Sequence, residues 1–451
     1  MLSLPLALLV AIVTQNATPL RAAARDTAAR QMNLAQGDWL EVRGERLGFL
    51  QVYDHRHERP GYVRPYQVRT YPVDERSARD LGAVIDFLHD QPGSEALGIG
   101  YVALFLRVAP PSTVDGTVFD ALGTFAERLA RRASSRWAKP GDAALAAEIE
   151  VAESYGVHFK SFAQEGRTRV CYDGEAFRRV LALPSPPVAK VRAALGLTEA
   201  ACVDPALPAA DRASLAAWRA DLLSQVDPSR FGSEVPLWLA NRLRLRRAAA
   251  QAEMAYFHAR KGEWKAAAAA GDAAVKELAL VDKQELADED GLSYAEAAVQ
   301  VGAIRWASEP AAATEQRGLE LSLATGQPGQ TCVRVSQKKT RLYEDCTYGV
   351  VWPASLRVSP RRDAVTFAVS TLPGWSELVL MRRGKSGWSA QPLAPAAIDP
   401  ELGYVELAGW SPDGAHLLVA REARVTGPFG QPGTEPPRVS RSFQILRAGE
   451  L

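Results

Sequence analysis

The sequence predicts a multidomain α+β protein. We expect a small N-terminal β-barrel, an Ala- and Arg-rich helical middle domain, and a C-terminal all-β domain that is either a sandwich or an incomplete propeller-like array. Three observations predict these parts: short aromatic and β-branched runs between glycine turns over Gly37–Val68, helical spacing from Glu75 to about Ser308, and short alternating runs beyond Glu309. We assign residues 18–73 to the barrel, 74–308 to the helical domain and 309–451 to the all-β domain.

Composition and charge narrow the class of protein. The chain is 47% hydrophobic and 23% charged, which is typical of a folded globular protein and argues against disorder. Its 53 Lys and Arg nearly balance its 52 Asp and Glu, so the net charge is +1. A net charge this small does not attract nucleic acid or an anionic membrane, and we expect no nucleic-acid partner.

The N-terminal apolar run Leu2–Val13 predicts a signal peptide over residues 1–17. Twelve residues are too few to span a bilayer, so no transmembrane segment is expected there. The run has no preceding Lys or Arg, and the polar stretch after it offers only an imperfect cleavage site near Ala17. The alternative is a non-signal N-terminal strand.

The four cysteines form two pairs that are local in sequence. Pairing Cys171 with Cys202 and Cys332 with Cys346 would give each of two domains its own disulfide, although four cysteines allow three connectivities. None lies in a CxxC motif or has a histidine at zinc-like spacing. Disulfides in an oxidising compartment are therefore favoured over free buried thiols, and we expect a periplasmic or secreted protein.

The segment Gly37–Val68 contains three short strands, Trp39–Val42, Phe49–Tyr53 and Gly61–Arg64, separated by glycine- and proline-containing turns. Gly37-Asp38, Phe49-Leu50-Gln51-Val52 and Gly61-Tyr62-Val63 follow one another in the order of a bacterial SH3-like (SH3b) barrel, which this segment resembles. The resemblance implies a module that binds a ligand and rarely catalyses a reaction.

Alternation along these strands predicts which aromatic side chains are buried. Trp39, Phe49 and Tyr62 are expected in the core, whereas Tyr53, Tyr66 and Tyr71 are expected to face an exposed groove. His55 and His57, from the polar run Asp54–Glu58, are expected at the rim of this groove. These histidines could also hold a metal with Asp54 or Glu58, but a stable site needs three or four convergent ligands, and we predict no metal site.

The helical domain is predicted from apolar residues spaced three and four apart. The ranges with this spacing are Ser77–Asp90, Val118–Arg132, Asp142–Tyr155, Glu175–Leu183 and Ala209–Val226. Ile99–Val108 is almost wholly apolar and predicts a buried core helix or strand. The cluster Arg242, Arg244, Arg246 and Arg247 is either an anion-binding face or, more in keeping with the neutral chain, a helical face with local ion pairs.

Residues 250–280 resemble one tetratricopeptide (TPR) hairpin. Ala255, Ala267 and Ala274 are small enough for two helices to approach closely, and Gly262 with Trp264 marks the turn. An ordinary antiparallel helix pair is the equal alternative, because a self-supporting array normally needs at least three repeats.

The C-terminal domain is predicted from short runs separated by Gly and Pro. The runs are Leu319–Leu323, Cys332–Val335, Thr340–Tyr343, Ala364–Val369, Glu377–Met381, Leu417–Ala420 and Ser442–Leu446. Gly409–Ala420, with Trp-Ser-Pro-Asp-Gly at its turn, resembles a blade of TolB-type propellers, and Arg357–Val369 is a degenerate copy. Residues 309–451 are too few for a closed propeller, so we expect a packed pair of sheets.

No GxSxG, HExxH, Walker P-loop or strand-borne GxGxxG is present, and no cofactor is predicted. We therefore expect a non-enzymatic, exported bacterial envelope protein, in which the SH3-like module binds a peptide, peptidoglycan or a protein and the other domains act as scaffold. One alternative is a hydrolase or transferase whose site is assembled from distant residues. Another is a purely structural interaction protein that uses its helical region.

Overall fold

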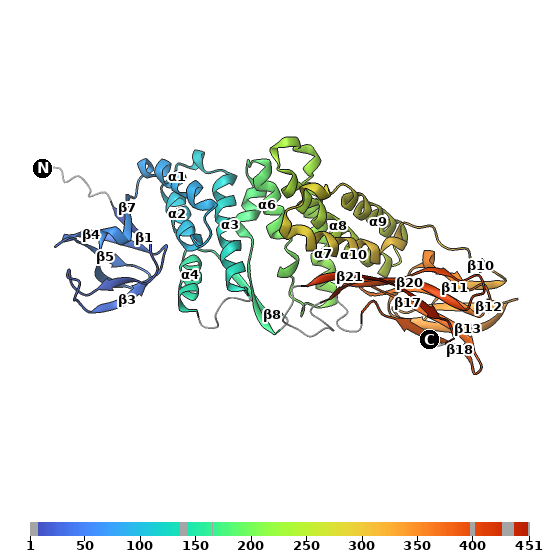
Figure 1. Cartoon of the computed structure of the whole chain (residues 1–451). Helices are drawn as coiled ribbons and strands as arrows, with labels where there is room; N and C mark the ends of the chain where they lie inside the picture. Colours follow the sequence, from blue (N-terminus) through green and yellow to red (C-terminus); the bar gives the residue numbers. More distant parts are fainter. Residues whose placement is uncertain (1–7, 136–141, 165, 397–401, 426–436, 450–451) are drawn as a thin grey trace. The chain divides into compact units, whose positions relative to one another are not determined.

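The structure is a computed structural model that describes residues 8–135, 142–164, 166–396, 402–425 and 437–449. The chain divides into two compact units, residues 1–207 and 208–451, which we describe separately. It is a mixed α+β multidomain protein with an N-terminal seven-stranded sheet and a C-terminal all-β region, as the sequence predicts (Figure 1). The predicted helical stretch is divided between the two units.

The first unit begins with an antiparallel sheet in the strand order β3-β2-β6-β5-β4-β1-β7. The strands are β1 (Leu9–Val13), β2 (Thr18–Arg21), β3 (Arg30–Leu34), β4 (Trp39–Arg46), β5 (Phe49–Asp54), β6 (Arg59–Val63) and β7 (Val68–Pro72). The sheet curls around a small aliphatic core that includes Ala11, Leu40, Val52 and Val63. The 3-10 turn η1 (Pro65–Gln67) leads from β6 into β7.

The N-terminal apolar run supplies a core strand of this sheet. Strand β1 pairs with β4 on one side and with β7 on the other, and Ala11, Ile12 and Val13 are fully buried. Residues 9–13 therefore form an N-terminal strand, which was the alternative to the signal peptide predicted for this segment. Residues 1–7 of that predicted peptide lie outside the described residues. Cleavage near Ala17 would remove β1, so the inference of export rests on the disulfides.

Helices follow the sheet in the first unit. They are α1 (Ala78–His89), α2 (Glu95–Val108), α3 (Gly116–Ala133), α4 (Ala143–Ser154), α5 (Glu175–Ala182) and α6 (Pro187–Leu197), with 3-10 turns η2 (Glu75–Ser77), η3 (Pro111–Thr113) and η4 (Ala200–Cys202). The apolar run Ile99–Val108 forms most of α2, whose residues Ile99, Val102 and Leu104 are fully buried. A hairpin of β8 (Phe159–Gln164) and β9 (Arg167–Tyr172), which the sequence analysis did not predict, lies between α4 and α5.

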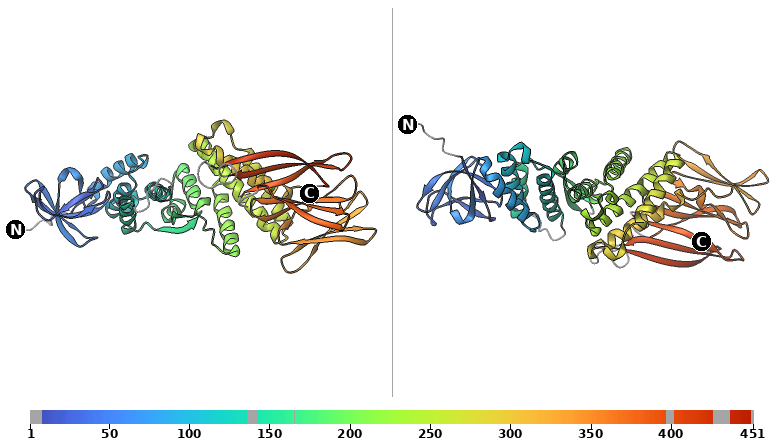
Figure 2. Two further views of the ribbon diagram at one scale, coloured as in Figure 1. Left: turned by 60° about the horizontal axis from the view of Figure 1, so that its bottom comes forward. Right: turned by 90° about the horizontal axis from the view of Figure 1, so that it is seen from above.

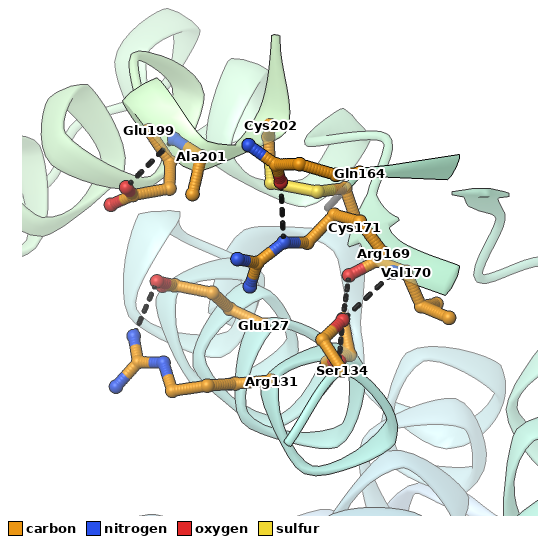
Figure 3. Close-up of a disulfide and its surroundings, with 11 residues drawn as sticks. Glu127, Arg131, Ser134, Gln164, Arg169, Val170, Cys171, Glu199, Ala201 and Cys202 are labelled. Atoms are coloured by element: carbon orange, nitrogen blue, oxygen red, sulfur yellow. Dashed lines mark hydrogen bonds and ion pairs between the residues drawn. A yellow bond between two sulfur atoms is a disulfide. The ribbon is translucent and has the colours of Figure 1, made fainter. Parts of the chain in front are cut away.

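Both disulfides have the predicted pairing. Cys171 of β9 is bonded to Cys202 of η4, which ties the hairpin to the end of the first unit (Figure 3). Ser134 at the end of α3 holds the same strand, because its hydroxyl donates to the carbonyl of Val170 and accepts from the amide of Val170. Cys332 and Cys346 are opposite one another on paired strands of the second unit.

The second unit begins with four α-helices among its described residues. They are α7 (Ala209–Gln225), α8 (Leu237–Arg260), α9 (Trp264–Ala279) and α10 (Gly291–Ala303), with 3-10 turns η5 (Pro228–Arg230), η6 (Gly232–Glu234), η7 (Lys283–Glu285), η8 (Asp288–Asp290) and η9 (Arg305–Ala307). The predicted helical hairpin is α8–α9, and Gly262 lies at its turn with φ +77°. Ala255, Ala267 and Ala274 are fully buried in the cluster between the two helices, which explains why small residues occur there.

The C-terminal strands form two sheets. A four-stranded sheet contains β10 (Glu315–Gln316), β11 (Leu319–Thr325), β12 (Thr331–Gln337) and β13 (Thr340–Thr347). An eight-stranded sheet contains β14 (Val350–Val351), β15 (Arg357–Val358), β16 (Ala364–Leu372), β17 (Trp375–Gly384), β18 (Gly387–Leu393), β19 (Gly403–Trp410), β20 (His416–Val425) and β21 (Arg438–Arg447), with η10 (Pro353–Ser355) after β14.

The two sheets share a hydrophobic cluster that contains Leu321, Val333, Phe367 and Met381, so this region is a packed pair of sheets. In both views of Figure 2 the yellow helices lie beside the orange and red strands, and α10 packs on β17, β19, β20 and β21. Strands β17 and β19 pair in parallel, which joins two antiparallel groups into the larger sheet. The two predicted blade turns lie side by side, since Arg361 Nε donates to the carbonyl of Asp413 at 2.5 Å.

Candidate functional site

The structure separates the five residues predicted for the binding groove into distinct surroundings. Tyr53 and His55 lie together on the outside of β4 and β5, with ring centroids 4.9 Å apart. The guanidinium of Arg43 lies 4.0 Å from the centroid of Tyr53. Glu41 Oε2 connects the group, because it lies 2.6 Å from His55 Nε2 and 3.1 Å from Arg43 Nη2. Hydrogen bonds from Arg43 and His55 lower the pKa of Glu41.

His57 belongs to a different, more buried cluster. Its Nδ1 lies 2.6 Å from Oδ2 of Asp54, a carboxylate that is 2% exposed. Arg56 Nη2 pairs with Asp38 at 3.1 Å, and Asp38 also accepts the amide of Ala35. Burial raises the pKa of Asp38 despite the adjacent Arg56. The two histidines thus bind different carboxylates, Glu41 and Asp54, and do not converge on a common point as two ligands of one metal would.

Tyr71 packs against the helices of the first unit and does not join the predicted groove. Its ring meets that of Tyr101 on α2 edge to face, at 5.8 Å between centroids. The helical core also includes Ile12 and contacts Trp39, so the outer face of β1, β4 and β7 is covered. The prediction that Trp39 lies in the barrel core is wrong, because alternation places Leu40 there and directs Trp39 to the opposite face.

Two glycines allow this close contact between the sheet and α2. Gly37 has φ +91°, and a Cβ at this position would lie 2.3 Å from the carbonyl oxygen of Ala96. A Cβ at Gly100 would lie 2.6 Å from the carbonyl oxygen of Gly37. The indole of Trp39 donates to Gly100 O at 3.1 Å, and the hydroxyl of Tyr155 donates to Gly37 O at 2.8 Å. The Gly37-Asp38 pair of the barrel motif therefore also shapes the contact with the helices.

A buried polar network joins the same two parts of the unit. Asn16, in the turn between β1 and β2, donates to Oε1 of Glu148 on α4 at 2.7 Å. Glu148 and Glu95 of α2, both almost completely buried, pair with the same nitrogen of Arg132 on α3. The barrel is thus held by apolar packing, close backbone contact and buried hydrogen bonds, and one side of it is closed to a ligand.

Tyr66 remains exposed on another part of the barrel. It lies on η1, with 72% of its surface accessible. Arg64, two residues earlier, connects three segments: it pairs with Asp26, donates to Gly48 O at 3.3 Å, and covers the ring of Phe49 at 3.7 Å. The hydrogen bonds from Arg64 lower the pKa of Asp26. We call the surface formed by Asp26, Leu47, Gly48, Arg64 and Tyr66 the Arg64 face; Phe49 is buried beneath Arg64.

The Arg64 face has the exposed apolar groups that a binding surface needs. Leu47 is 78% exposed and has φ +50°, an unusual conformation for a branched residue. An exposed Leu and Tyr beside an Arg–Asp pair offer apolar contact together with hydrogen bonding to a ligand. The sequence predicts an exposed Tyr66 but not the role of Leu47, Arg64 or Asp26. The Arg64–Asp26 pair has no local signal, because it joins residues that are 38 positions apart.

The arginine cluster of α8 is used within the second unit. Arg242 pairs with Asp290 and Glu289, each at 2.7 Å. Arg247 pairs with Glu277 at 2.7 Å, and Arg244 donates to the carbonyl of Leu280. These contacts favour the predicted helical face with local ion pairs over an anion-binding face.

Comparison with protein-family models, curated proteins and solved structures found no match to this chain. Within the described ranges, none of the helices has the length and apolar character needed to cross a membrane. The two disulfides fit an exported protein.

Proposed function

We propose that this chain is a non-enzymatic, exported bacterial envelope protein whose SH3-like barrel binds an extended peptide segment through the Arg64 face. Such a segment occurs in a peptidoglycan stem or in a partner protein. The observation that carries the proposal is the exposure of Tyr66 and Leu47 next to the ordered Arg64–Asp26 pair.

Strand order supports the assignment to SH3-like barrels. The motif strands are consecutive antiparallel neighbours, β4, β5 and β6, and a 3-10 turn precedes the last strand. Strand β1 completes the sheet between β4 and β7. The candidate surface draws on the loop between β2 and β3, the turn between β4 and β5, and η1, so side chains from three separated segments can contact one ligand.

The chemistry of the Arg64 face suits a peptide. Tyr and Leu supply contact area at low entropic cost, while the Arg–Asp pair can exchange hydrogen bonds with a peptide backbone or an acidic side chain. The opposite side of the barrel is occupied by α2, so a ligand approaches from the Arg64 face or from the separate Tyr53–His55 patch. The helical and C-terminal regions then act as scaffold.

Export is supported by the disulfides. Both sets of sulfurs are bonded, one in each compact unit, and no free cysteine is present among the described residues. Disulfides persist in the periplasm and outside the cell, where peptidoglycan stems and envelope proteins are accessible.

Co-sedimentation with purified peptidoglycan sacculi, and pull-down of envelope proteins, test the proposal. We expect Tyr66→Ala to weaken binding about tenfold, because truncating an interface tyrosine often costs more than 1 kcal/mol. Tyr348→Ala is the matched control, since Tyr348 is 56% exposed and lies in the second unit. Equal retention of the two variants would reject the Arg64 face.

A further inference from the structure

The second unit contains a cleft of about 710 Å³ that is separate from the barrel. Its lining comes from η9, the turn after β10, η10 with β15, and the end of β19 with the Ser411-Pro412 turn. This volume falls in the range of small-molecule sites, roughly 300–1,000 Å³. The cleft thus lies beside the Trp-Ser-Pro-Asp-Gly turn that the sequence analysis singled out.

Arginine side chains gather around one aromatic ring in this cleft. The guanidinium carbons of Arg305 and Arg357 lie 4.2 Å and 5.7 Å from the ring centroid of Trp306. Arg317 also lines the cleft, from a turn where its φ is +54°. In the part of the chain that the structure describes, neither Arg317 nor Arg357 is paired with a carboxylate. Nη1 of Arg357 donates to the carbonyls of Ala354 and Leu356, each at 2.8 Å, but these neutral acceptors leave both guanidinium charges to attract an anion.

Two carboxylates lie among these arginines. Glu406 pairs with Arg305 at 2.9 Å, and Glu309 lies in the exposed part of the lining. The described lining residues therefore carry three guanidinium groups against two carboxylates, one of which is already paired. The lining therefore carries a net charge of one positive unit. The two guanidinium groups that have no carboxylate partner are those of Arg317 and Arg357.

We propose that this cleft binds a small ligand through a carboxylate group, with Arg357 and Arg317 pairing with the anion. The chemical class is a short peptide with a free carboxyl terminus, or a free organic acid of similar size. Guanidinium groups bind carboxylates in a bidentate manner, and contact with the Trp306 ring restricts the orientation of Arg305 and Arg357. The site belongs to the second unit and does not depend on the barrel's function.

Calorimetry with the full-length protein tests this site with three probes: a tripeptide acid, the same tripeptide with an amidated C-terminus, and citrate. We expect the acid to bind at least tenfold more tightly than the amide. Binding of citrate alone would assign the site to free organic acids, whereas binding of the tripeptide acid would assign it to peptide termini. Equal affinity for acid and amide, or no binding of any probe at millimolar concentration, would overturn the proposal.

Two variants locate the site. Arg357→Gln should weaken binding of the acid about tenfold, and Arg383→Gln, an exposed arginine of β17 outside the cleft, should not. Arg317→Gln removes the other guanidinium that has no carboxylate partner and should also weaken binding of the acid about tenfold. Unchanged affinity in both cleft variants would show that the probe binds elsewhere.

Discussion

Substituting Gly37 by alanine should disrupt the contact between the barrel and α2. The added methyl group would lie 2.3 Å from the carbonyl oxygen of Ala96 and 2.8 Å from its carbonyl carbon. Both atoms belong to the backbone of a buried helix and cannot rotate away as a side chain would. The φ of +91° adds strain, because residues with a Cβ rarely adopt that conformation.

The expected loss of stability follows from three contributions. The left-handed backbone costs roughly 1–2 kcal/mol for a residue with a Cβ. Moving the turn away from α2 breaks the hydrogen bonds from Trp39 to Gly100 O and from Tyr155 to Gly37 O, worth about 1 kcal/mol each. We therefore predict that Gly37→Ala destabilises the first unit by about 3–4 kcal/mol.

Hydrogen exchange measured by mass spectrometry on the full chain can test this value one unit at a time. The opening free energy of amides in β1, β4 and α2 should fall by the predicted amount, while amides of α8 and α9 should be unaffected. Gly93→Ala is the control for backbone strain alone, since Gly93 has φ +86° and no atom within 4 Å of an added Cβ. If Gly37→Ala cost no more than Gly93→Ala, the close contact with α2 would not stabilise the barrel.

Three further predictions concern the same architecture. Replacing Cys171 and Cys202 by serine should lower the stability of the first unit by about 3–4 kcal/mol, because the disulfide restricts a loop of 31 residues in the unfolded chain. A urea midpoint equal to that of the oxidised wild type would contradict this. A chain that begins at Thr18 lacks β1, so its barrel should not fold; hydrogen-exchange protection of β4 and β7 at the wild-type level would refute the central position of that strand. The pKa of Asp38 is raised, so the folded chain binds this proton more tightly than the unfolded chain. As the pH falls through the folded-state pKa toward the ordinary value, the wild type should therefore gain stability relative to Asp38→Asn. If Asp38 were not buried, urea titrations from pH 7 to pH 4 would show a constant difference in stability between the two proteins.

Local signals in the sequence predicted much of the fold. The strands β4, β5 and β6 follow from aromatic and β-branched runs, and Gly48 lies at the turn between the first two as predicted. Gly44 and Pro60-Gly61, which were expected in turns, instead lie within β4 and β6. The burial of α2 follows from its apolar character, although the sequence left open whether this run is a helix or a strand. Both disulfides follow from the short separation of each cysteine pair. These features need no knowledge of distant contacts.

Features that depend on distant contacts were not predicted. Trp39 lies on the opposite face of β4 from Leu40, and alternation within one strand does not reveal that helices cover this outer face. The apolar run Leu2–Val13 was interpreted as a signal sequence, with a strand as the alternative, because its partners β4 and β7 are not evident from the run itself. The β8–β9 hairpin lies between helices, and its short, partly polar strands gave too weak a pattern.

The candidate site shows the same division. Exposed Tyr66 was predicted, but Tyr71 became part of the helical interface through Tyr101, which is 30 residues away by number. The Arg64 face depends on the pairing of Arg64 with Asp26, and no local motif contains both residues. The exposure of a single side chain can thus be predicted from the alternation of residues along the chain. The set of residues that surrounds a ligand is known only once the barrel is folded.

A hydrogen-exchange footprint of the full chain with solubilised peptidoglycan fragments or a captured partner peptide tests the central claim most directly. The account predicts new protection in three segments of the Arg64 face, residues 22–29, 46–49 and 64–67, with no change in β1 or β7, which already pack against the helices. Protection confined to Tyr53 and His55, or no protection anywhere in the barrel despite measurable binding, would contradict it.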